Sequence, residues 1–205
     1  MMNDRFVESI QIRNNQLLHL PLHEARFNKT RFHFFGITTP FLISSLFSAT
    51  FWKSLDKYKV YKLRVVYAEK VENWELIPYE RPKIESLRLV TDNCIGYHWK
   101  SLNRDSIQRL YLQKANADDI LIVKNSLITD SSYMNVAFLD KNDKWLTPQT
   151  PLLGGTQRAY LLSKGIIEEA TIGVDDVFKF SHIRLFNALN SWEEAIELPI
   201  SAIIS

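Results

Sequence analysis

The chain has 205 residues, which is enough to bury a substantial core in one large domain or two small ones. Its 25 Lys and Arg residues nearly balance its 23 Asp and Glu residues, so the charge gives no indication of a nucleic-acid partner or a membrane surface. Cys94 is the single cysteine, which excludes an internal disulfide framework and a cysteine-rich metal site.

The start of the chain and its hydropathy both bear on its location. Residues 1–5 hold no apolar stretch of signal-peptide length, and no segment approaches about twenty continuous apolar residues. We therefore expect a soluble, cytoplasmic protein without a membrane partner.

The first part of the chain predicts a small lobe. Apolar residues alternate where strands are expected and recur at helical spacing elsewhere. The expected elements, in chain order, are a strand at 6–12, a turn at Asn14 and Asn15, a short strand at 17–20, a helix from Leu22 to Phe35 that ends near Gly36, a helix from Pro40 to Leu55, and paired strands at 62–67 and 74–79.

The second part predicts a larger lobe that begins with a helix. The expected elements are that helix at 103–115, three consecutive antiparallel strands at 120–123, 127–129 and 135–139, a helix from Thr156 that ends before Gly165, and short strands with one short helix near 175–179. The predicted fold class is therefore mixed α/β (α+β, with mixed sheets), in two lobes at 1–88 and 89–205.

An ordered series of three chemical groups runs through the second part. Lys100 comes first, Asp130 follows among small polar residues, and Gly154-Gly155 comes before an expected helix. A pyridoxal phosphate site needs an amine for a Schiff base, a counter-charge for the pyridinium nitrogen and a cradle for the phosphate. The series therefore predicts a site for pyridoxal 5'-phosphate.

Each group has an ordinary structural explanation when it is taken alone. Lys100 by itself is typical of a surface lysine before a helix, and Asp130 of a turn residue. Gly154-Gly155 is typical of a simple turn, and Arg26 of a solvated helix arginine. The order of the series, more than any one residue, favours the functional interpretation.

From about Phe6 onward the chain resembles the class IV aminotransferase family, the fold-type IV pyridoxal-phosphate enzymes. This family includes branched-chain aminotransferase, D-amino acid aminotransferase and aminodeoxychorismate lyase. The resemblance is carried by the larger lobe at about 97–200, and more loosely by Phe6-Val7-Glu8-Ser9-Ile10 and His23-Glu24-Ala25-Arg26. It implies the two-lobed, D-amino acid aminotransferase-like fold.

The resemblance also assigns roles to individual residues. Lys100 lies where the family places its Schiff-base lysine, and Asp130 lies five residues before the recurring asparagine, Asn135, where glutamate is usual. Aspartate is one methylene shorter, so direct contact with the ring nitrogen and contact through a water stay open as alternatives. The residues implied to bind the cofactor, most of them near its phosphate, are Arg26, Lys100, Asp130, Asn135, Gly155, Thr156, Gln157, Asn187 and Ala188.

Within the family, the run Lys100-Ser101-Leu102-Asn103 and the run Asn187-Ala188-Leu189 are similar to the lyase branch. The resemblance thus implies an enzyme that acts on a small-molecule amine and forms 4-aminobenzoate and pyruvate. Two alternatives are an amino-acid transaminase and a pyridoxal-phosphate-binding protein without turnover. The family further implies a homodimer, and the spacing of the five histidines predicts no metal site.

Overall fold

The computed structural model describes residues 4–204, so the expectation drawn from the first three residues lies outside the described part. The chain divides into two compact units. Unit 1 holds residues 4–80 and Trp99–Asn103, and unit 2 holds Arg81–His98 and residues 104–204. The expected lobes were 1–88 and 89–205; here residues 81–88 group with unit 2, and the segment that contains Lys100 groups with unit 1.

Unit 1 is a four-stranded antiparallel sheet with helices. Its strand order is β2-β1-β3-β4. The elements are β1 (Phe6–Arg13), β2 (Gln16–Leu17), α1 (Leu20–Phe35), the 3₁₀ helix η1 (Ile43–Leu46), α2 (Ala49–Ser54), β3 (Tyr61–Tyr67) and β4 (Val71–Pro78).

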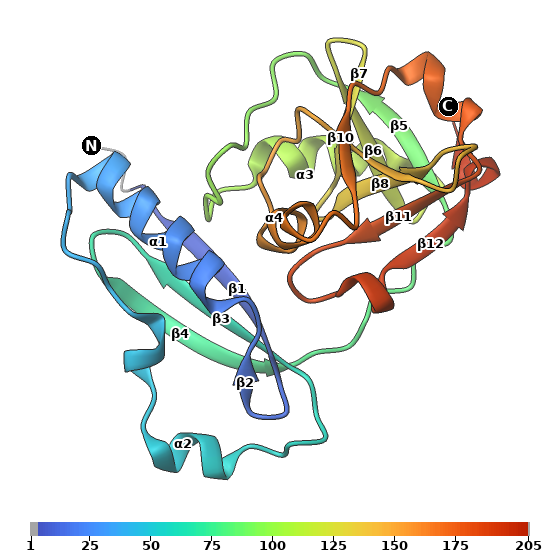
Figure 1. Ribbon diagram of the computed structural model, residues 1–205. Helices are drawn as coiled ribbons and strands as arrows, with labels where there is room; N and C mark the ends of the chain where they lie inside the picture. Colours follow the sequence, from blue (N-terminus) through green and yellow to red (C-terminus); the bar gives the residue numbers. More distant parts are fainter. Residues whose placement is uncertain (1–3, 205) are drawn as a thin grey trace. The chain divides into compact units, whose positions relative to one another are not determined.

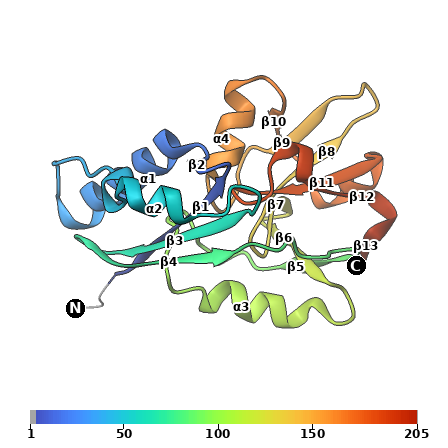
Figure 2. The ribbon, with the colours of Figure 1, turned by 90° about the horizontal axis from the view of Figure 1, so that it is seen from below.

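The core of unit 1 lies between this sheet and α1. Figure 1 shows α1 alongside β1, and Figure 2 shows α1 and α2 on the same face of the sheet. Inward residues of β1 and β3 pack against α1, and the rings of Phe27 and Tyr67 are tilted by 34° with their centroids 4.1 Å apart. The expected end of α1 is confirmed, because Gly36 takes the left-handed conformation at φ 67°.

Two local expectations for unit 1 are wrong. The helix expected from Pro40 to Leu55 is split into η1 and α2, because Phe47 and Ser48 are extended and the Ser48 hydroxyl caps α2 by accepting from the Phe51 N–H. The strand expected at 17–20 ends at Leu17, since His19 is left-handed and α1 already begins at Leu20.

Unit 2 is built on a mixed sheet. The helices and strands are β5 (Leu87–Thr91), α3 (Asp105–Tyr111), η2 (Leu112–Lys114), β6 (Asp119–Lys124), β7 (Leu127–Ser131), β8 (Asn135–Leu139), β9 (Trp145–Pro148), α4 (Thr156–Ser163), β10 (Glu168–Ala170), η3 (Val174–Lys179), β11 (His182–Phe186), η4 (Trp192–Glu194), β12 (Ile196–Pro199), η5 (Ile200–Ala202) and β13 (Ile203–Ile204).

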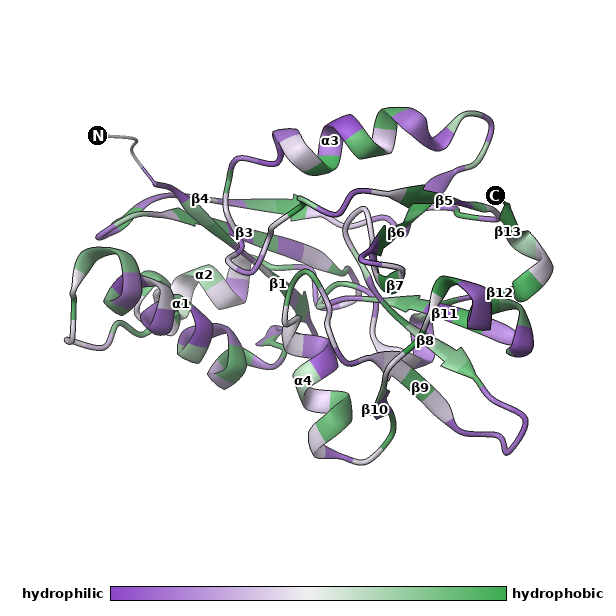
Figure 3. Ribbon diagram, turned by 90° about the horizontal axis from the view of Figure 1, so that it is seen from above, coloured by the Kyte–Doolittle hydropathy of each residue, from purple (hydrophilic) through white to green (hydrophobic). Residues whose placement is uncertain are grey.

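The order along this sheet is β10-β9-β8-β7-β6-β5-β13, and β11 pairs with both β8 and β12. The expected antiparallel run of three strands is confirmed as β6, β7 and β8, and the helix expected from Thr156 is confirmed as α4. Helices α3 and α4 lie on opposite sides of the sheet (Figure 2). In Figure 3, α3 alternates hydrophobic and hydrophilic residues, as expected of a helix that buries one face with Ile107 and Leu110.

Candidate active site

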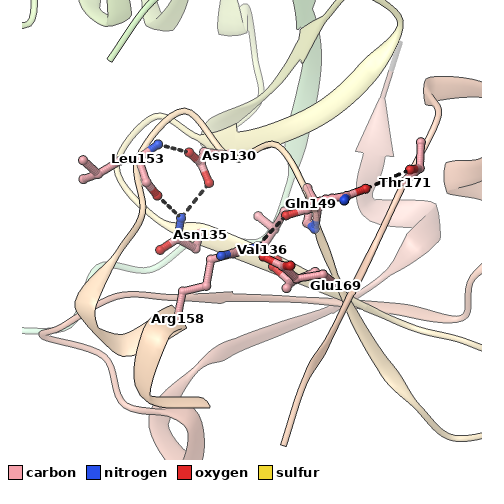
Figure 4. A network of polar contacts seen from close by, with 10 residues as sticks. Asp130, Asn135, Val136, Gln149, Leu153, Arg158, Glu169 and Thr171 are labelled. Atoms are coloured by element: carbon pink, nitrogen blue, oxygen red, sulfur yellow. Dashed lines mark hydrogen bonds and ion pairs between the residues drawn. The ribbon is translucent and has the colours of Figure 1, made fainter. Parts of the chain in front are cut away.

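Asp130 is a buried carboxylate on β7, directly opposite Asn135 on β8. Its Oδ1 accepts a hydrogen bond from Asn135 Nδ2 at 2.8 Å, and its Oδ2 accepts from the Leu153 N–H at 3.0 Å. Asn135 Nδ2 also donates to the Leu153 carbonyl at 2.9 Å, which closes a triangle of contacts (Figure 4). The carboxylate is therefore fixed in place by two donors that both favour its charged form.

The protonation of Asp130 is set by opposing effects. Burial raises the pKa of Asp130 to about 6, while hydrogen bonds from Leu153 and Asn135 and the positive charge of Arg158 act in the other direction. A cation placed beside this carboxylate would stabilise its charged form. Asp130 is thus a buried carboxyl group whose charged form a neighbouring cation would favour.

Gly155 lies at the start of α4, in contact with Asn135. It is the N-cap of the helix at φ −68° and ψ 147°, so its conformation does not itself require glycine. A Cβ at this position would overlap Asn135 Oδ1 and lie 3.2 Å from Asn135 Cγ. Glycine is needed here because of this close approach.

The first turn of α4 brings Thr156 and Gln157 next to this glycine, and both side chains are buried. The first N–H groups of a helix have no partner within the helix, and the positive end of its dipole favours an anion. The expected phosphate turn therefore has the local geometry of an anion site.

Arg158 follows in the same turn and was not among the residues predicted for the site. It is 7% exposed, and its Nη2 donates to the Pro148 carbonyl at 2.8 Å and to Glu169 at 2.7 Å (Figure 4). Its charge acts on Asp130, as described above. The sequence could have indicated Arg158 through its place in Gly155-Thr156-Gln157-Arg158, the run that predicted the phosphate turn.

Asn187 and Ala188 form a turn after β11. Asn187 Oδ1 accepts from the N–H groups of Leu189 at 2.8 Å and Asn190 at 3.0 Å, so this oxygen organises its own turn. Asn187 Nδ2 donates to the Tyr133 carbonyl at 3.4 Å. The turn thus contacts the β7–β8 connection, close in sequence to Asp130 and Asn135.

In unit 1, Arg26 on α1 is bound side-on by Glu8 of β1. Arg26 Nε donates to Glu8 Oε1 at 2.8 Å and Nη2 donates to Oε2 at 2.6 Å. His23 Nδ1 lies 2.6 Å from the same Oε2. His23 and Arg26 are three residues apart on α1, which places both on the face toward β1.

Burial alone would raise the pKa of Glu8, but the charge and hydrogen bonds of Arg26, with His23, lower it to about 2. The pKa of His23 is lowered, first by burial and further by the charges of Arg26 and Lys100, although Glu8 opposes this. Glu8 is therefore a carboxylate and His23 a neutral imidazole at neutral pH.

Glu8 was also missed from the sequence. The available signal was its position: it shares the inward face of β1 with Phe6 and Ile10, where a charge is unusual unless it is paired. The pairing itself was not visible, because its partners are 15 and 18 residues away.

The segment with Lys100 is bonded to the start of β1. The Val7 N–H donates to the Lys100 carbonyl at 3.0 Å, and the Leu102 N–H donates to the Arg5 carbonyl at 2.8 Å. Trp99 stacks on His33 of α1, with ring centroids 4.5 Å apart. The segment around Lys100 is thus held by main-chain hydrogen bonds and by the stacking of Trp99 on His33. Lys100 itself is half-buried.

Residues 4–204 contain neither a membrane-spanning helix nor a cluster of metal ligands. No helix there is long and apolar enough to span a bilayer. No three His, Cys, Asp or Glu side chains in that range are grouped as a metal ion would require.

Comparison with known proteins gives consistent matches. The family model described as amino-transferase class IV matches residues 5–195. An uncharacterized protein of Haemophilus influenzae is 32% identical over 183 residues, which are 89% of this chain and 96% of that protein.

Solved structures match as well. A Haemophilus somnus protein, provisionally described as a 4-amino-4-deoxychorismate lyase, is 28% identical with a TM-score of 0.84, over 93% of this chain and 99% of that one. A hypothetical aminotransferase of Mycobacterium tuberculosis, in its PLP-bound form, is 16% identical with a TM-score of 0.76, over 96% of this chain and 81% of that one, which shows the shared fold. This chain therefore belongs to the class IV aminotransferase family and is a fold-type IV, pyridoxal-phosphate-dependent lyase or aminotransferase.

Proposed function

We propose that this enzyme is aminodeoxychorismate lyase-like and forms 4-aminobenzoate and pyruvate from a small-molecule amine. The observation that carries the proposal is the similarity to the Haemophilus somnus protein, which is provisionally described as such a lyase and is matched over 99% of its length. The runs Lys100-Ser101-Leu102-Asn103 and Asn187-Ala188-Leu189, which resemble the lyase branch, support it.

The residues present fit the cofactor on three observations within the units. Asp130 is a buried carboxylate that accepts hydrogen bonds from two N–H donors, as a counter-charge to a protonated ring nitrogen should be. Gly155 opens a helix whose first N–H groups suit a phosphate. The guanidinium of Arg26 is fixed in its plane by two hydrogen bonds to Glu8, as suits a group that recognises a phosphate.

Pyridoxal phosphate, when bound, supplies an aldehyde that takes up an amine and a ring that withdraws electrons from the reacting carbon. The amine of Lys100 would hold this cofactor, and its Nζ would then be the base that takes the proton leaving the substrate ring. Asp130, as a carboxylate, would keep the ring nitrogen protonated, directly or through a water. Asn135 keeps Asp130 in position for this.

We propose a set of phosphate donors, residue by residue. The guanidinium of Arg26 offers charge-assisted hydrogen bonds. Because the Asn187 N–H already donates to the Asn190 carbonyl at 3.2 Å, we assign the direct contact there to the backbone N–H of Ala188, in the turn that Asn187 organises. The full proposed set is Arg26, Gly155, Thr156, Gln157, Asn187 and Ala188.

A direct assay separates the lyase from the runner-up, an amino-acid transaminase of the same family. The enzyme is incubated with aminodeoxychorismate, and 4-aminobenzoate and pyruvate are measured together. Release of both in equal amounts is expected. Amino-group transfer from an amino acid to a 2-oxo acid, without release of 4-aminobenzoate, would replace the lyase with the transaminase. Binding of the cofactor without any response to an amine panel would indicate a protein without turnover.

We also propose that the enzyme is a cytoplasmic homodimer. The edge strand β4 of unit 1 exposes Trp74 and Ile77, at 37% and 39%, and Trp74 contacts the rings of Phe47 and Phe51. Such a group of partly exposed aromatic residues suits a subunit interface. Sedimentation equilibrium is expected to give twice the 24.0 kDa chain mass, and a monomer with full activity would refute the dimer.

A further inference from the structure

The Glu8 cluster, defined as Glu8, His23 and Arg26, is a buried ion pair with an added histidine. Glu8 is 0% exposed, and both of its oxygens are used by partners on α1. The Nε and Nη2 edge of Arg26 is occupied by this carboxylate at 2.8 and 2.6 Å. A side-on fork of this kind fixes both the position and the plane of a guanidinium.

The same strand supports the reactive lysine. Val7 precedes Glu8 and bonds the Lys100 carbonyl at 3.0 Å, and Phe6 forms a bridge with Ser101. The start of β1 therefore holds the Arg26 guanidinium by a side chain and the Lys100 segment by the main chain. Glu8 fixes the orientation of the Arg26 guanidinium through two hydrogen bonds.

We propose that Glu8 is a positioning residue for phosphate recognition: by holding the plane of Arg26, it gives the enzyme its preference for the phosphorylated form of the cofactor. This inference rests on the proposed role of Arg26. A carboxylate that served only to stabilise the fold would not distinguish a phosphorylated ligand from an unphosphorylated one.

Two probes test this distinction, pyridoxal 5'-phosphate and pyridoxal, which lacks the phosphate. Each is titrated into cofactor-free protein, and the ratio of the two dissociation constants measures the contribution of the phosphate. In Glu8→Gln, the amide oxygen can still accept one hydrogen bond from Arg26, but the charge and the second acceptor are lost. We expect affinity for pyridoxal phosphate to fall about 10- to 100-fold, as for loss of a hydrogen bond to a charged group, and affinity for pyridoxal to change less than about threefold.

Three further variants make the result interpretable. Glu75→Gln removes another carboxylate of unit 1, paired with Arg64 at 2.6 Å, and is the matched control that should leave the ratio unchanged. Glu8→Asp keeps the charge and should recover part of the preference. In an Arg26→Ala background, adding Glu8→Gln should cause no further loss of preference. Circular dichroism checks that each variant is folded. If Glu8→Gln is not folded, the ratio of the two dissociation constants is compared between Glu8→Asp and the wild type. A weaker preference for pyridoxal phosphate in Glu8→Asp is then the expected result, and an unchanged preference would overturn the proposal.

The outcomes separate this inference from the proposed function. If the wild type binds both probes equally, or Arg26→Ala keeps the preference, the proposed phosphate role of Arg26 is wrong. If those two proteins behave as expected but Glu8→Gln loses affinity for both probes equally, or for neither, only the positioning role of Glu8 is overturned.

Discussion

The contact between Gly155 and Asn135 makes Gly155→Ala a sharp test of the candidate site. A Cβ at residue 155 would overlap Asn135 Oδ1, so either the Asn135 amide or the start of α4 must move. Movement of the amide breaks its hydrogen bonds to Asp130 and Leu153, at 2.8 and 2.9 Å. A buried hydrogen bond contributes about 1 kcal/mol, and one to a charged group about 1.5–3 kcal/mol. We therefore expect Gly155→Ala to lower the free energy of unfolding by about 2–4 kcal/mol.

Urea denaturation and thermal melting measure this change. For a chain of this size, the expected loss corresponds to a fall in Tm of about 4–16 °C. Gly154→Ala is the matched control, because a Cβ there meets nothing within 4 Å and neither glycine has a positive φ. Removing the flexibility of glycine at such a site is neutral or stabilises by about 0.4–1 kcal/mol. The neighbouring substitution should therefore be tolerated.

A double-mutant cycle identifies the cause. In an Asn135→Ala background the overlapping oxygen is gone, so adding Gly155→Ala should cost less than about 1 kcal/mol. Equal stability of Gly155→Ala and Gly154→Ala would refute the reasoning. So would an unchanged cost of Gly155→Ala in the absence of the Asn135 amide.

Three further predictions concern Lys100 and Asp130. Borohydride reduction should link the cofactor covalently to Lys100 of the wild type, as measured by peptide mass spectrometry. Lys100→Ala should trap no cofactor. Trapping in that variant would show that Lys100 is not the lysine that binds the cofactor. Asp130→Asn should largely abolish turnover while cofactor binding persists, because an amide cannot hold a ring nitrogen protonated. Asp130→Glu should retain activity. Unchanged turnover of Asp130→Asn would mean that Asp130 is only a turn residue. Burial raises the pKa of Asp130 from 3.8 to about 6, so the folded cofactor-free protein binds this proton more tightly than the unfolded chain does. The free energy of unfolding should therefore fall as pH rises from about 4 to 6, by an amount on the order of 3 kcal/mol. Urea denaturation across that range should show a steeper fall in the wild type than in Asp130→Asn, where Asp119, whose pKa burial also raises, still contributes; identical slopes would contradict the prediction.

Much of unit 2 follows from local sequence. Short apolar runs at 120–123, 127–129 and 135–139, separated by turn residues, predict three antiparallel strands, and Gly154-Gly155 marks the start of α4. Asp130 and Asn135 are five residues apart across a tight connection, so strand pairing alone places them opposite each other. Short-range patterns suffice here because neighbouring residues supply the hydrogen bonds.

The sequence alone did not reveal the partners of the candidate site residues. Glu8 meets Arg26 only when β1 and α1 pack, and no periodic pattern links residues 18 positions apart. The requirement for glycine at 155 comes from Asn135, which is 20 positions earlier, and not from its own backbone angles. The Lys100 segment joins unit 1 through main-chain bonds to β1, against the expected boundary. Sequence thus determined which reactive groups exist and in what order, whereas tertiary packing decided their hydrogen bonds, charges and steric limits, because these depend on contacts between distant residues.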